Sequence, residues 1–124
     1  MPIRKINLAS KLATFSDYFS PKIVGELNGQ HVKLVKFQGE FVWHHHEAED
    51  EMFLVLSGKF TMQLRPEDGG EVEVSAGEFI VIPRGTEHRP VADEEVAILL
   101  FEPATTLNTG NVDSERTVRE PQRI

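Results

Sequence analysis

The sequence predicts an all-β domain, an antiparallel sandwich or barrel with a short helix in front of it. Two observations favour this class. Seven or eight short apolar runs follow one another at a spacing of about ten residues, separated by turn residues such as Gly58 and Pro83. Between these runs, no segment shows the apolar spacing of a helix. The 124 residues are enough for one core of ordinary size.

A short helix is expected near the N-terminus. Asn7 is a suitable N-cap, and Leu8, Leu12 and Phe15 follow it at helical spacing. Pro21 ends this helix at the latest, because the residue before a proline disfavours helical backbone. Residues 1–30 are therefore expected to form a helical or extended appendage.

The barrel is expected over residues 31–103. Its strands are expected at 31–37, 40–46, 51–57, 59–65, 71–74, 78–82 and 95–102. The remaining residues, 104–124, are polar and irregular in pattern. We expect this tail to pack on the barrel or on a partner.

Composition and charge argue against several classes of protein. Hydrophobic residues make up 40% of the chain and charged residues 27%, as in an ordinary globular domain. The net charge of −7 argues against a nucleic-acid partner, which would need a basic face. No apolar run approaches the roughly 20 residues of a membrane span, and the first residues lack the apolar core of a secretory signal. We expect a cytoplasmic protein with no membrane partner.

Three consecutive histidines, His44 to His46, lie in the expected strand 40–46. Because side chains alternate across a strand, His44 and His46 share one face and His45 lies on the other. Glu51 begins the next strand, where its carboxylate can join the two imidazoles, whereas the rival Asp50 has the opposite parity. With no cysteine in the chain, such a site suits divalent Mn, Fe, Co, Ni, Cu or Zn. The alternative is a solvated, charged loop between two strands.

A second segment, Gly77 to Pro90, completes a resemblance to the cupin superfamily. The first cupin motif is matched by His44-x-His46, four residues, Glu51, six residues and Gly58. The second is matched by Gly77, five residues, Pro83-x-Gly85, two residues and His88. The resemblance spans about residues 37 to 102. Two departures are that Gly39 is one residue closer to His44 than usual, and that Ala92 stands where the family often has Asn.

The resemblance implies a cupin-type antiparallel jelly-roll β-barrel with a short N-terminal helix, as in small single-domain metal-binding cupins. It also implies that one divalent transition metal ion is bound by His44, His46, Glu51 and His88, with His45 facing away. Four protein ligands on an octahedral ion would leave two positions for water, substrate or oxygen, whereas a structural zinc site would be closed.

Around this site, the pattern predicts an apolar lining, typical of a pocket for a small organic ligand. The expected lining residues are Val42, Phe53 and Val55, with Phe79 and Val81 as further candidates. The candidates for a general base, by residue type alone, are Glu49, Glu87, Glu102 and Tyr18, each expected in solvent or at a rim. Small cupins are often labelled as sugar-phosphate isomerases, but only Arg65, Arg84 and Arg89 lie near suitable places for a phosphate.

Three functional hypotheses stay open, because one fold carries many chemistries. The first is a metal-dependent enzyme that acts on a small oxygenated organic molecule chelating the metal. The second is a non-catalytic binding or sensor protein for a small ligand. The third is a metal-free structural barrel with vestigial histidines.

The expected outer face of the barrel also suggests self-association. It carries the apolar residues Phe41, Trp43, Met52, Leu54 and Leu56, too many for open solvent. A second copy would cover them in a homodimer. The alternative is coverage by the first thirty residues of the same chain.

Overall fold

The computed structural model describes residues 2–124 and places one helix at the start of the chain. Helix α1 (Leu8–Leu12) begins as predicted, since the side-chain oxygen of Asn7 accepts a hydrogen bond from the backbone N–H of Ser10 at 3.0 Å. It ends at Leu12, so Phe15 lies outside it. Within residues 2–124, no helix is long and apolar enough to cross a membrane.

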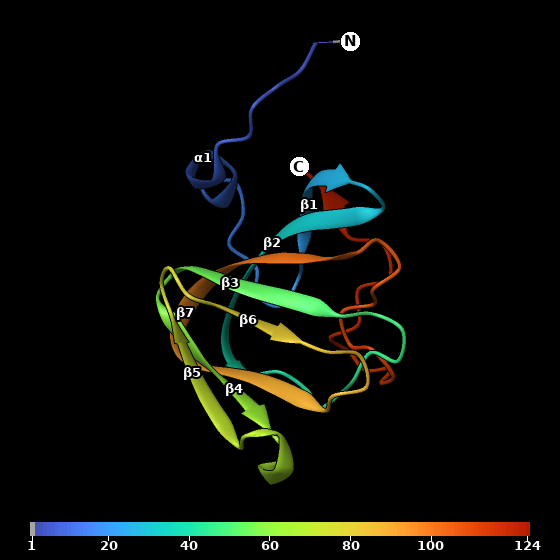
Figure 1. Ribbon diagram of the computed structural model, residues 1–124. Coiled ribbons are helices and arrows are strands. Elements are labelled where there is room, and N and C mark those ends of the chain that lie inside the picture. Colours follow the sequence, from blue (N-terminus) through green and yellow to red (C-terminus); the bar gives the residue numbers. More distant parts are fainter. Residues whose placement is uncertain (1) are drawn as a thin grey trace.

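Nearly all of the remaining regular structure is β-sheet, as expected (Figure 1). The strands are β1 (Lys22–Leu27), β2 (Gln30–Glu40), β3 (Glu51–Ser57), β4 (Lys59–Leu64), β5 (Glu71–Ser75), β6 (Phe79–Ile82), β7 (His88–Pro103) and β8 (Gln122–Arg123), with a 3-10 turn at Pro66–Asp68. The main path runs β5-β4-β7-β2-β1-β8, and β3 pairs with β6 and β7. The pairs are antiparallel except β1 with β8, where the end of the chain returns to the sheet.

Strand β7 creates the jelly-roll shape because it belongs to two layers. One edge of β7 pairs with β2, while the other edge pairs first with β4, over His88 to Val91, and later with β3, over Ala97 to Phe101. Between these parts, residues 93–95 bulge out opposite a shift in β2. Because β7 bends there, β4 and β5 lie in one layer and β3 and β6 in another, and these two layers face each other (Figure 1).

Because of this bulge, one expected strand boundary was wrong. The sequence predicted a strand over residues 95–102, whereas β7 starts seven residues earlier, at His88. The acidic residues of the bulge are exposed, so they resemble a loop in the sequence although the strand continues through them.

The expected strand 40–46 is also wrong. Strand β2 ends at Glu40, and the chain then runs as an irregular segment beside the start of β7. His44 and His88 exchange two backbone hydrogen bonds, at 3.1 and 2.9 Å, as an isolated bridge. The next histidine bonds to the C-terminal tail instead, which interrupts the ladder. The alternation of side chains nevertheless persists without a strand, since His44 and His46 are buried and His45 is partly exposed.

The layers enclose an aromatic and aliphatic core. Its members include Phe37, Phe53, Val55, Phe60, Met62, Val96, Ile98 and Leu100. Phe41, expected on the outer face, instead packs against this core and stacks on Phe19 with ring centroids 5.3 Å apart. Trp43 is half-buried beneath the guanidinium of Arg65, 3.9 Å from its ring centroid.

Two expected lining residues face outward. Phe79 and Val81 are 62% and 49% exposed, while Ile82 is buried. Their register explains this, because Phe79 pairs with Leu54 and Val81 with Met52 on β3, and paired residues share a face. The apolar run 78–82 did not show which alternate residues point inward.

Candidate metal centre

The four residues singled out as metal ligands meet at one end of the core. One donor atom from each of His44, His46, Glu51 and His88 lies within 4.8 Å of the others, and all four residues are buried. The two histidines at 44 and 46 come from the segment after β2, whereas Glu51 and His88 are the first residues of β3 and β7. The fold therefore brings His88 to a site more than thirty residues away in the sequence.

Backbone carbonyls orient two of the imidazoles. Nδ1–H of His44 donates to the carbonyl of Val42, and Nδ1–H of His88 donates to the carbonyl of Thr86, each at 2.8 Å. A carbonyl only accepts hydrogen bonds, so Nδ1 carries the proton in both rings and Nε2 keeps its lone pair. Nε2 of each ring is therefore available as a metal donor.

The inner atoms of the cluster lack hydrogen-bond partners. His46 Nε2, His88 Nε2 and Glu51 Oε1 are buried and unpartnered. The carboxylate oxygen lies 3.3 Å from His46 Nε2 and 3.4 Å from His88 Nε2. Buried polar atoms without partners are costly and rare in folded proteins. Nitrogen and carboxylate donors that converge in this way fit a divalent transition metal ion.

The surroundings of His44 and Glu51 shift their pKa values so that both can donate to a metal near neutral pH. Burial lowers the pKa of His44 to about 4, with repulsion from His88 as the next cause, so the ring stays neutral. Burial by itself raises the pKa of Glu51, but the nearby polar groups of Glu102, His46 and His88 outweigh burial and hold the pKa well below its ordinary value. Glu51 is therefore ionised.

A second buried carboxyl, Glu102, lies beside Glu51. The sequence placed it at a rim, whereas it is 2% exposed and its Oε2 pairs with Nζ of Lys33 at 2.7 Å. Burial, followed by the negative charge of Glu51, raises the pKa of Glu102 well above its ordinary value, and Lys33 only partly opposes this. Lys33 and Glu102 lie on neighbouring strands, β2 and β7, but their apolar neighbours in the sequence gave no signal that the two charges meet.

The other candidates lie away from the cluster. Asp50, the rival carboxylate, accepts the backbone N–H of Arg84 at 2.9 Å. His45 faces outward, and hydrogen bonds to Glu87 and Glu47 raise its pKa. The remaining general-base candidates are engaged elsewhere: Glu49 accepts from Thr105, and Tyr18 donates to Glu95.

The C-terminal tail fastens the histidine segment, a role that the sequence did not indicate. Asn111 accepts the backbone N–H of His45 at 2.8 Å and donates its own N–H to the carbonyl of His45 at 3.1 Å. The preceding Gly110 has a φ of 56° and leaves no room for a side chain, because an added Cβ would collide with that carbonyl oxygen.

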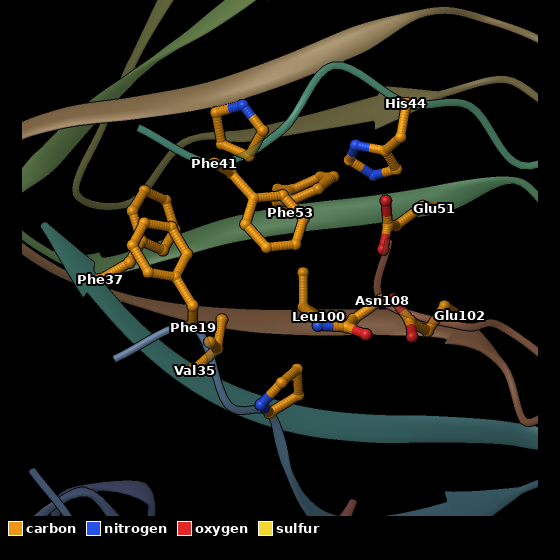
Figure 2. A pocket seen from close by; sticks show the side chains of 12 residues that line it. Phe19, Val35, Phe37, Phe41, His44, Glu51, Phe53, Leu100, Glu102 and Asn108 are labelled. Carbon is orange, nitrogen blue, oxygen red and sulfur yellow. The ribbon is translucent and has the colours of Figure 1, made fainter. Parts of the chain in front are cut away.

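A cavity opens against the cluster (Figure 2). Its lining is Phe19, Pro21, Val35, Phe37, Phe41, His44, Glu51, Phe53, Pro90, Leu100, Glu102 and Asn108. Of the expected lining residues, Phe53 lines it, and Val55 lies nearby in the core. The cavity brings an apolar chamber into contact with two of the four candidate ligands, His44 and Glu51.

A jelly roll with three buried histidines and a glutamate at one end defines a cupin-type protein. The cupin domain family matches residues 31–102, and the chain belongs to this family.

Related proteins agree with this assignment. A cupin-2 domain protein from Shewanella frigidimarina is 42% identical, with a TM-score of 0.75 over 79% of this chain and 93% of that one. Protein NMB1881 from Neisseria meningitidis is 30% identical, with a TM-score of 0.73 over 82% of this chain and 100% of that one. The uncharacterised Bacillus subtilis protein YdbB is 38% identical over 66 residues, 53% of this chain, and the match spans 57% of the length of that relative.

Proposed function

We propose that the chain binds one divalent transition metal ion through His44, His46, Glu51 and His88. The observation that carries the proposal is the convergence of their donor atoms within 4.8 Å in a buried site where three of those atoms have no partner. Without an ion, these unpartnered atoms would each cost free energy, on the order of 1–3 kcal/mol.

We further propose that the site is that of an enzyme acting on a small oxygenated organic molecule. A bound divalent ion supplies Lewis-acid polarisation of an oxygen ligand or lowers the pKa of a bound water. The cavity beside His44 and Glu51 gives such a molecule access to the site. The buried carboxyl of Glu102 lines the same cavity, which supports a role as a proton carrier next to the site.

The alternative is a binding or sensor protein that captures the ligand without turnover. One observation favours it: Glu102 is held by both Lys33 and Glu51, which limits its freedom to exchange a proton with a ligand.

The metal site is tested by elemental analysis of protein purified without chelator. We expect one ion per chain in the wild type and in His45→Ala, a matched control because this histidine faces outward. His46→Ala and His88→Ala should lose the ion while keeping their β-sheet circular dichroism. A metal content that is equally high in all four proteins would refute the assignment.

The two functions are separated by assaying the metal-loaded protein against a broad panel of small hydroxy, keto and enol compounds. Turnover that disappears in His88→Ala supports the enzyme. Saturable binding without turnover across the whole panel supports the alternative.

We also propose that the chain forms a homodimer through the outer face of β6 and β3. Paired residues form apolar rows there, Val81 with Met52 and Phe79 with Leu54. Residues 2–30 of the same chain leave Phe79 and Val81 exposed, which supports a second copy as the cover. We expect sedimentation to give about twice the 14.0 kDa of one chain, and Phe79→Lys to give a monomer. A wild-type monomer at micromolar concentration would exclude this.

A further inference from the structure

The cavity beside the candidate metal centre has an apolar part and a polar end. Phe19 stacks on Phe37 and on Phe41, with ring centroids 5.2 and 5.3 Å apart. In Figure 2, these rings lie at one end and the carboxyl groups of Glu51 and Glu102 at the other. A ligand that reaches the metal would therefore place its apolar body against the phenyl rings.

The polar end holds carboxyl groups but no cationic side chain among the described lining residues. Lys33 is near, but its ammonium is occupied by Glu102 at 2.7 Å. The three arginines that the sequence offered as phosphate ligands lie elsewhere: Arg65 and Arg89 lie over Trp43, and Arg84 pairs with Asp50. A phosphate group would meet two carboxyls here without an arginine or a free lysine to compensate.

Glu102 has an oxygen that the protein leaves without a donor. Oε2 accepts from Lys33, whereas no N–H or O–H of residues 2–124 reaches Oε1, and the neighbouring polar group is the carboxyl of Glu51. Because Glu102 lines the cavity, a hydroxyl or N–H on a ligand can bond to this carboxyl.

The free space is small. The cavity volume is ≈ 40 Å³, room for roughly three waters at about 10–15 Å³ each. The cavity therefore takes a ligand with a short body.

Building on the proposed metal site, we infer that its ligand is a small, unphosphorylated molecule with a short apolar body, a metal-chelating oxygen and an adjacent hydroxyl or N–H that bonds to Glu102. Glu102 is then a specificity-determining residue, which acts on the ligand and not on the metal.

The test uses the full chain loaded with Co²⁺ and the probes acetohydroxamic, propionohydroxamic and butyrohydroxamic acid, with inorganic phosphate for comparison. Each hydroxamic acid offers chelating oxygens and an adjacent N–H, and the three differ only in the length of the apolar body. Cobalt absorption first reports metal binding and then probe binding. Failure to bind Co²⁺ refutes the metal site, whereas Co²⁺ binding without the expected probe pattern refutes the present inference alone.

We expect the Kd to fall about threefold to fourfold with each added methylene until the cavity is full, as burial of one methylene predicts. Phosphate should bind at least about tenfold more weakly than acetohydroxamic acid, since a lost charge-assisted hydrogen bond alone is worth about that much. Val35 lines the cavity, so Val35→Ala enlarges it and should extend the gain in affinity to a longer acyl chain. Equal affinity along the series, or tighter binding of phosphate, overturns the inference.

Glu102→Gln tests the proposed recognition directly. We expect a roughly tenfold loss of hydroxamate affinity with Co²⁺ affinity changed less than threefold, from the loss of a hydrogen bond to a charged group. Glu87→Gln, which alters a carboxylate outside the cavity, should change neither affinity. An equal loss of Co²⁺ and hydroxamate affinity in Glu102→Gln would mean that Glu102 acts through Glu51, and would overturn its assignment.

Discussion

The buried ion pair of Lys33 and Glu102 allows a stability prediction that is independent of any activity. The two side chains are each 2% exposed, and their charged atoms are 2.7 Å apart. Lys33→Met removes the ammonium and leaves the carboxyl of Glu102 buried without its partner. Methionine has a similar volume, so packing changes little.

The expected cost follows from this burial. Breaking a buried pair by removing one partner costs about 3–5 kcal/mol. Glu102 can offset part of this by taking up a proton, because burial already raises its pKa and the loss of Lys33 raises it further. We therefore expect about 3 kcal/mol near pH 8. Over 124 residues, an unfolding entropy of about 2.1 cal/mol/K per residue converts this to a fall in Tm of roughly 10 °C.

The pH dependence follows from the sign of that shift. A carboxyl whose pKa is higher in the folded than in the unfolded chain holds its proton more tightly in the folded state, so its protonation stabilises the fold as pH falls. The deficit of Lys33→Met relative to the wild type should therefore shrink from pH 8 toward pH 5.

Urea unfolding of metal-free protein, followed by circular dichroism at several pH values, measures the deficit. Lys59→Met is the matched control, because Lys59 pairs with Glu73 at 3.8 Å on the surface and its loss should cost less than about 0.5 kcal/mol. The double variant Lys33→Met/Glu102→Gln should recover part of the loss. A deficit under about 1 kcal/mol at pH 8, or one that grows as pH falls, would show that the pair does not act as described.

Three further predictions follow from the site. If the metal is bound, excess Zn²⁺ should raise the Tm of the wild type and not of His88→Ala, and a chelator should reverse the rise; a Tm that ignores both additions would contradict the site. Gly110→Ala should lower the Tm and weaken metal binding, because its Cβ would collide with the carbonyl of His45. Gly70 has a similar positive φ but open space around it, so Gly70→Ala measures the backbone cost alone. An equal fall in Tm in both variants would count against the collision. In the folded protein His44 stays neutral down to a pKa of about 4, whereas in the unfolded chain it takes up a proton near pH 6.5. As the pH falls from 6.5 to 4, the free energy of unfolding of the metal-free wild type should therefore drop by about 3 kcal/mol relative to that of His44→Gln. Parallel pH profiles of the two proteins would exclude this.

Much of the fold was predictable from local patterns. The spacing of apolar runs indicated an antiparallel β domain, and Asn7 marked the start of the helix. The errors arose where hydrogen-bond partners came from distant parts of the chain. The segment after β2 alternates like a strand, but its carbonyls bond to the tail and to the start of β7, so no ladder forms. The acidic bulge in β7 similarly resembles a loop although both of its flanks are paired.

The candidate site was predictable for a different reason. Alternation placed His44 and His46 on one side, and the motif resemblance added Glu51 and His88, the set whose donor atoms lie together. Glu102 was misplaced because a lone acidic residue at the end of an apolar strand usually faces solvent. Only the pairing of β2 with β7, which brings Lys33 and Glu102 together on one face, shows that the carboxyl of Glu102 is buried.

The order of residues along the chain determined the strand-forming runs, the parity of the histidines and the spacing of the two motifs, because these depend on interactions between near neighbours. The direction in which Phe79 and Val81 point, the burial of Lys33 with Glu102 and the attachment of the tail at Gly110 were decided by tertiary structure. Each of these depends on which surfaces meet across the fold, and short-range periodicity carries no information about that.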